Sequence, residues 1–319
     1  MRSSWRRARY VSFVWLVAGG LHAEAAVPFT PGNLLIVHSE SNTLREYTPA
    51  GALVQKISVP LSGSPATEYA RDVTVFDPSH VAIYNGSFMP WLSRFDAQSN
   101  VWTHDTEPGW STVNNGTFGG ITHRGDQIFV TDMNTGQPPQ TQQGLLRFDP
   151  GGSTWTRFGS FDQYIDVTLG LDGRLYALSS AHAYDSGGLV RVFDPDTLAF
   201  ERNINLTGGN SIRGIAVNAA GEIFAAGHDK TLRRFDGNGN LLSTLQMGVG
   251  LADVDLSSDH RLLAVGGLSV FVLTDQMAPL SSFTISATYT GIFGAFVVPE
   301  PATILLLALG GPAAVRRPR

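Results

Sequence analysis

The chain has 319 residues, of which 43% are hydrophobic and only 15% are charged, with 35 glycines and 17 prolines. This composition excludes disorder and favours a turn-rich all-β fold. The absence of cysteine excludes disulfides, thiolate metal ligands and cysteine nucleophiles. Residues 26–299 hold 15 basic and 25 acidic residues, a net charge near −10 that makes nucleic acid an unsuitable partner.

The N-terminus has the pattern of a secretory signal peptide. Four arginines lie within the first nine residues, an apolar run covers 10–21, and small residues follow at 23–26. The apolar run of about a dozen residues is too short for a stable membrane span, which needs roughly 20. We therefore predict a signal peptide with a helix over 1–25, removed after Ala23 or Ala25, with a retained anchor as the alternative.

The body is a repeat. A short sequence motif recurs, in which a basic or polar residue is followed by an apolar or aromatic residue and then by Asp or Thr. The central residue of the motif is Tyr47, Phe95, Phe148, Phe193, Phe235 and Leu273 in turn. Each copy of the motif follows a short apolar strand, a tight turn and a second strand, as in 212–226. Four strands in about 40–50 residues are typical of a propeller blade. The body thus reads as an all-β, six-bladed β-propeller over 28–298.

Ring closure also has a candidate in the sequence. Residues 291–297 read as an inner strand with no blade after it, and 33–37 as a second strand with no inner strand before it. Pairing them completes one blade from both ends of the body and leaves no open sheet edge. The segment 212–245 is similar to NHL-type propeller repeats, and the other repeats are similar more loosely.

Candidate binding residues lie where loops lead into the inner strands, on the face that propellers usually use for binding. Long loops at 85–92, 132–144 and 181–188 are expected on the same face. Charged residues there are expected to form a ring around the channel, as a ligand-binding set or as a structural set that satisfies its own charges. An arginine beside an aspartate lowers the carboxyl pKa, so we expect poor proton donors near neutral pH. The five residues are Arg71, Asp72, Asp166, Arg213 and Asp253.

A metal or catalytic site has weaker support. Asp166 with Asn115 and Asn210 resembles part of the calcium cluster of lactonase-like propellers, but no glutamate lies in an inner strand. The loop 236–240 resembles the start of an EF-hand but lacks the bidentate glutamate, so it reads as a blade turn. The histidines show no paired spacing and no G-x-S-x-G elbow occurs. We predict no cofactor, with calcium as a possibility.

Tryptophans gather in the second and third repeats, at 91, 102, 110 and 155. An exposed indole would stack on the sugar rings of a polysaccharide, whereas a buried one would pack between blades. The sequence leaves both readings open.

The C-terminus combines Pro299-Glu300-Pro301, an uncharged apolar run over 302–315 and a cluster containing Arg316 and Arg317. As a helix the run reaches about 21 Å, short of a hydrocarbon core of about 30 Å. The three features, in this order, resemble the PEP-CTERM sorting signal, which exosortase handles in Gram-negative bacteria that make exopolysaccharide. The resemblance implies a sorting tail over 299–319 with a short hydrophobic helix and transient membrane contact. An ordinary C-terminal anchor is the alternative.

These features predict an exported protein of the cell envelope or the extracellular space. We expect a non-catalytic binding module, with the secretion machinery and exosortase as processing partners and a polysaccharide or another surface protein as ligand. The alternative is a calcium-dependent lactonase or hydrolase on the channel face. The sequence does not name the ligand.

Overall fold

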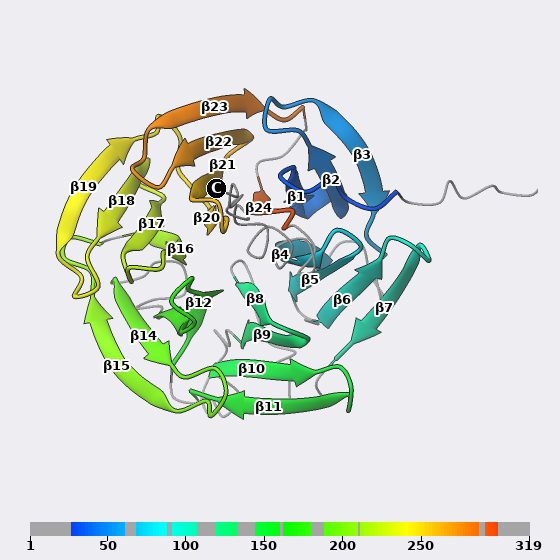
Figure 1. The fold of residues 1–319 in the computed structure, drawn as a ribbon, viewed down its shortest axis with the longest axis horizontal. Coiled ribbons are helices and arrows are strands. Elements are labelled where there is room, and N and C mark those ends of the chain that lie inside the picture. The colour runs from blue at the N-terminus through cyan, green and yellow to red at the C-terminus, as the bar shows by residue number, and fades with distance from the viewer. Residues whose placement is uncertain are drawn as a thin grey trace, which may run out of the picture.

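The computed structural model describes residues 27–60, 68–87, 91–106, 119–132, 144–159, 162–179, 188–209, 211–286 and 291–298. These residues form 24 strands in six antiparallel sheets of four strands each. The sheets are arranged around a central axis as the blades of a propeller (Figure 1). The predicted all-β, six-bladed architecture is therefore confirmed.

Each blade runs from an inner strand at the channel to an outer strand at the rim. Blade 1 consists of β24 (Ile292–Phe296), β1 (Leu34–His38), β2 (Thr43–Tyr47) and β3 (Leu53–Ser58). Blade 2 consists of β4 (Glu68–Asp77), β5 (His80–Ser87), β6 (Trp91–Asp96) and β7 (Val101–Asp105). Blade 3 consists of β8 (Ile121–Arg124), β9 (Gln127–Asp132), β10 (Gly144–Asp149) and β11 (Thr154–Phe158). A 3-10 turn, η1 (Ser39–Ser41), joins β1 to β2.

Blades 4 to 6 follow the same order without a break in the sequence. Blade 4 consists of β12 (Tyr164–Leu169), β13 (Leu175–Ser179), β14 (Leu189–Phe193) and β15 (Phe200–Asn205). Blade 5 consists of β16 (Ile212–Val217), β17 (Ile223–Gly227), β18 (Thr231–Phe235) and β19 (Leu241–Gln246). Blade 6 consists of β20 (Asp253–Leu256), β21 (Arg261–Gly266), β22 (Ser269–Thr274) and β23 (Pro279–Thr284).

Burial changes steadily from the channel to the rim. The second strands β1, β13 and β17 are buried along their whole length because both faces of each pack against a neighbouring blade. The outer strands β19 and β23 instead alternate between half-buried and exposed residues, since only one face is covered. The core therefore lies between the blades, close to the inner two strands.

The recurring aromatic residue is the packing anchor of its blade. The Phe95 ring lies 4.6 Å from that of Trp102, and the Phe148 ring lies 4.6 Å from that of Trp155. Trp91 is buried, with its ring 5.3 Å from that of His104. In these contacts each of the three tryptophans packs on a ring of its own blade, and Trp110 lies outside the described residues.

Ring closure follows the predicted route. Strand β24 pairs antiparallel with β1, with Ile36 opposite Gly294 and Leu34 opposite Phe296. Blade 1 is thus completed by segments from both ends of the body, which lie side by side in Figure 1. All four strands of the closing blade are hydrogen-bonded, so the described sheets join into a full circle.

The predicted signal peptide (1–25) and sorting tail (299–319) lie outside the described residues, and so do their helices. Within the part of the chain that the structure describes, no helix is both long and apolar enough to cross a membrane.

Candidate functional site

The channel is lined by the six inner strands. At one register position of these strands, every second blade carries an aspartate. Asp72, Asp166 and Asp253 occupy it in β4, β12 and β20, opposite Tyr84, Leu178 and Val265 of the second strands. In the blades between them the position holds Gly120, Gly214 and Phe293. The inner strands therefore repeat with a period of two blades.

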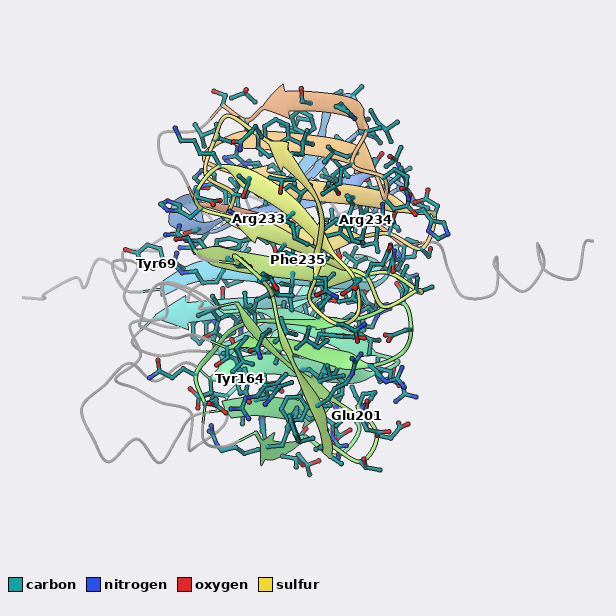
Figure 2. The ribbon with its side chains drawn as sticks, turned by 90° about the vertical axis from the view of Figure 1, so that its left-hand side faces the viewer. Tyr69, Tyr164, Glu201, Arg233, Arg234 and Phe235 are labelled. Carbon is teal, nitrogen blue, oxygen red and sulfur yellow. The ribbon has the colours of Figure 1, made fainter. Side chains whose placement is uncertain are left out.

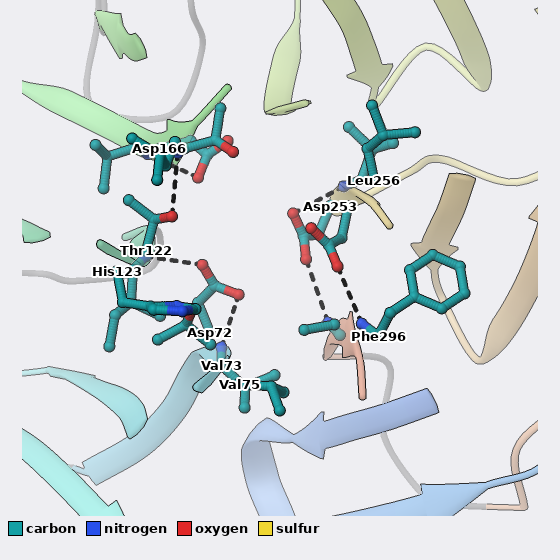
Figure 3. A pocket seen from close by; sticks show the side chains of 18 of the residues that line it. Asp72, Val73, Val75, Thr122, His123, Asp166, Asp253, Leu256 and Phe296 are labelled. Carbon is teal, nitrogen blue, oxygen red and sulfur yellow. Dashed lines mark hydrogen bonds between the residues drawn. The ribbon is translucent and has the colours of Figure 1, made fainter. Parts of the chain in front are cut away.

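Each aspartate joins two inner strands through its two carboxylate oxygens. One oxygen accepts the N–H of the following residue in its own strand: Val73 at 2.7 Å, Val167 at 2.8 Å and Val254 at 2.7 Å. The other accepts an N–H from the next blade: Ile121 at 2.9 Å, Ile215 at 2.7 Å and Gly294 at 3.2 Å. The three carboxylates, here called the aspartate ring, fasten blade 2 to 3, 4 to 5 and 6 to 1 (Figure 3).

Two glycines make room for this arrangement. A Cβ on Gly120 would collide with Oδ1 of Asp166 and with the amide nitrogen of Val167. A Cβ on Gly214 would lie 2.8 Å from the Cα of Asp253. Blades 3 and 5 therefore approach the next blade at a glycine, whereas blades 2, 4 and 6 reach it with a carboxylate.

The electrostatics of the ring differ from the sequence prediction. Burial raises the pKa of Asp72 and Asp166 well above the ordinary value, and mutual repulsion with Asp253 adds to the effect. Burial likewise raises the pKa of Asp253 to about 7, although two main-chain N–H donors oppose the shift. The expectation that arginines would lower these values was wrong, because loss of solvation outweighs any neighbouring positive charge.

The two predicted arginines lie in different settings. The guanidinium of Arg71 lies over the Tyr69 ring, 4.8 Å from its centre, and donates to Oγ of Ser39 at 3.2 Å. Arg213 borders a small space of about 10 Å³ on the side where the inner strands begin, together with all three ring aspartates and Phe293. The structure thus brings Arg213 and the aspartates around one space, while Arg71 is directed to blade 1.

The larger part of the channel lies on the other side of the ring, where the inner strands end. This channel cavity has a volume of about 210 Å³. Its polar lining combines the ring with Thr74, Thr122, His123, Thr168, Asp255 and Ser257. The expected binding face is the opposite one, and most of its long loops lie outside the described residues.

His123 and Asp255 are two titratable residues of this cavity that the sequence did not mark as site residues. Thr74 Oγ1 lies 2.7 Å from Nδ1 of His123, and burial lowers the pKa of this imidazole to about 4. Asp255 accepts the N–H of Phe296 at 3.0 Å, and burial raises its pKa. His123 is consequently neutral at pH 7.

Among the described residues, no group of three or more histidines, aspartates or glutamates is arranged to hold a metal ion. Asn115 and Asn210, which the lactonase-like pattern would require, lie outside the described ranges. The loop 236–240 is a blade turn, in which Asp236 accepts the N–H groups of Asn238 and Asn240 at 2.9 Å each.

Comparison with known proteins identifies the fold alone. No family model and no curated protein matches the sequence. Among solved structures, the WD40 domain of Neurospora crassa Pan2 is similar with a TM-score of 0.52, 13% identity and coverage of 86% of this chain and 79% of that one. A chain of a nidogen/laminin complex has a TM-score of 0.59 at 12% identity, covering 83% and 99%. A Bacteroides caccae protein of unknown function has 0.57 at 10%, covering 83% and 99%.

Proposed function

We propose that this chain is an exported six-bladed propeller that acts as a non-catalytic binding module in the cell envelope or outside a Gram-negative cell. The signal-peptide pattern and the PEP-CTERM-like tail support export, and imply processing by exosortase with transient membrane contact. The ligand we propose is a polysaccharide or another surface protein. The likeness to a chain from a nidogen/laminin complex is consistent with an interaction role.

The observation that carries this proposal is the commitment of the channel carboxylates to the fold. Both oxygens of each ring aspartate accept a main-chain N–H, and one of the two donors always belongs to another blade. The ring thereby holds the blades together. The cavity beside it, at about 210 Å³, is smaller than the roughly 300–1,000 Å³ of usual small-molecule sites.

One observation favours the rival function, a hydrolase. A carboxyl group with a pKa of about 7, such as Asp253, is suited to proton transfer at neutral pH. The case against catalysis is therefore geometric: the three ring aspartates already hold strands in place, so a substrate would have to displace them.

The test is turnover by the purified protein. We expect no hydrolysis of lactones or esters, with Ca²⁺, Mn²⁺ or Zn²⁺ added. Turnover that disappears in Asp166→Asn but persists in Asp236→Asn, a change of a partly exposed turn residue in blade 5, would establish an active site in the channel and refute the proposal.

A further inference from the structure

The two ends of the propeller body lie on the same side of the molecule. The N–H of Phe29 donates to the carbonyl of Pro78, in the turn between β4 and β5, at 2.6 Å. The N–H of Gly32 donates to the carbonyl of Val297 at 2.9 Å, which joins the two ends to each other. Val298 lines the channel cavity, where the inner strands end. We call this side of the propeller the exit face.

Topology places the starts of the outer strands on the exit face as well. In every blade the four strands alternate in direction from the inner strand to the outer one, so an outer strand begins where the inner strand ends. In Figure 2, Tyr69 and Tyr164, near the starts of inner strands, lie toward the left, whereas Glu201, near the start of β15, lies toward the right. The right-hand side of Figure 2 is therefore the exit face.

Exposed apolar side chains are confined to this side of the described structure. Nine large hydrophobic residues are exposed among the described ones, and seven of them are the first or second residue of an outer strand. Leu53 in blade 1 and Leu242 in blade 5 are examples, at 54% and 51% exposure. The other two are Val27, which precedes β1, and Leu171, in the turn after β12. Apolar side chains gathered on one face indicate contact with another surface.

The charges of the exit face do not select a charged partner. Carboxylates on its turns are already paired within the propeller, as Glu222 is with Arg234 at 2.8 Å and Asp259 with Arg261 at 2.9 Å. Asp236 accepts the N–H groups of its own turn. A surface without net charge, such as a zwitterionic lipid headgroup layer, therefore fits the exposed apolar side chains.

The sequence after Val298 indicates that a bilayer covers this face. Only three residues, 299–301, separate Val298 from the uncharged apolar run 302–315. Fully extended, the four steps from Val298 to Ala302 span at most about 14 Å. Because Val298 lies at the channel and not at the rim, so short a link keeps the exit face toward the phase that the run enters.

We propose that the exit face lies against a lipid bilayer while the run 302–315 is inserted in it, with the exposed apolar side chains in contact with the lipid surface. The channel cavity then opens toward the membrane. The opposite side, where the inner strands begin, points away from the membrane and meets the polysaccharide or protein ligand. The inference rests on the membrane contact of the proposed function and adds to it the surface that faces lipid and the side that binds the ligand.

Single labelling sites in the full chain test this arrangement, because the chain has no cysteine of its own. Leu171→Cys and Leu242→Cys place a polarity-sensitive fluorophore on the exit face. Lys230→Cys, in the turn between β17 and β18 of the same blade as Leu242, places it on the opposite side. All three side chains are exposed, so labelling is compatible with folding. Ala308→Cys marks the apolar run, and each labelled chain is reconstituted in phosphatidylcholine vesicles that contain a spin-labelled lipid as quencher.

We expect the Leu171 and Leu242 sites to be quenched several-fold more strongly than the Lys230 site, which the five residues of β18 place up to roughly 16 Å further from the lipid. The emission of the two exit-face sites should also shift to the blue as the fluorophore enters apolar surroundings. With the Ala308 site quenched, equal quenching on both sides, or quenching without a blue shift, would overturn the inference and leave the proposed membrane contact standing. An unquenched Ala308 site would overturn the membrane contact and this inference with it.

Discussion

The centre and the rim of this propeller hold neighbouring blades together by opposite means. At the centre, three buried carboxylates join main chain to main chain, and each is less than a tenth exposed. At the rim, arginines reach across to the next blade's turns; Arg147 and Arg234 are each about a fifth exposed, at 19% and 18%. The comparison shows that the central contacts are coupled to protonation, whereas the rim contacts lie where solvent screens charge.

The two regions also differ in their repeat unit. The aspartate ring connects blades in pairs, 2 with 3, 4 with 5 and 6 with 1, so the centre has approximate three-fold order. Contacts at the rim instead run through consecutive junctions from blade 3 to blade 1, where Ser281 donates to the carbonyl of Pro49 at 2.5 Å. A six-bladed ring is thus built on a three-fold centre and a rim that changes from blade to blade.

The largest expected effect is the pH dependence of the centre. Asp253 has a pKa of about 7 in the folded protein and an ordinary pKa near 3.9 when unfolded. Between these values the folded state keeps a proton that the unfolded state has released. Stability from this group is therefore full below about pH 4 and is lost as pH rises through 7, by about 4 kcal/mol.

Urea unfolding of the wild type and of Asp253→Asn, from about pH 4 to 7.5, measures this effect. The free energy of unfolding of the wild type, relative to the variant, should fall as pH rises. A difference between the two proteins that stays constant over this range would show that Asp253 titrates normally, and that the centre is no more sensitive to protonation than the rim.

A smaller effect is expected from Gly120→Ala, which tests the close approach between blades 3 and 4. The added methyl group collides with Asp166 and with the main chain of Val167, so the aspartate must move from its two N–H donors. We expect a loss of about 3 kcal/mol in urea unfolding. Gly151→Ala, at an open rim position, should change stability by less than about 0.5 kcal/mol; equal losses in the two variants would contradict a tight centre.

Much of the architecture could be predicted from the sequence because it depends on local signals. The recurring aromatic-Asp motif and the turns between short apolar runs indicate the number and order of the blades. The two unmatched strands at 33–37 and 291–297 indicate which strands pair to close the ring. The three ring aspartates lie in segments that the same signals mark as inner strands or as the loops leading into them. Each of these features can be recognised from the residues of a single blade, or from the two ends of the body.

The role of those aspartates could not be predicted, because their partners lie in other blades. Asp72 and Asp166 each accept an N–H from a residue 49 positions away, and Asp253 from one 41 positions away. Aligning the inner strands would have shown Asp alternating with Gly120 and Gly214, a signal that reading each repeat separately misses. Burial, which reverses the expected pKa shift, is a property of the closed ring.

The smallest expected effect concerns the rim. Arg147→Met keeps the length of the side chain but removes its bond to the Asp196 carbonyl and its ion pair with Asp149, whose atoms lie 3.1 Å apart. Because both groups are partly exposed, we expect a loss of about 1 kcal/mol at low salt and less in about 1 M salt, where the ion pair is screened. Urea unfolding at the two salt concentrations measures this. A salt-independent loss as large as that of Gly120→Ala would place the main contact between blades 3 and 4 at the rim, because the partly exposed arginine would then contribute as much as the buried centre.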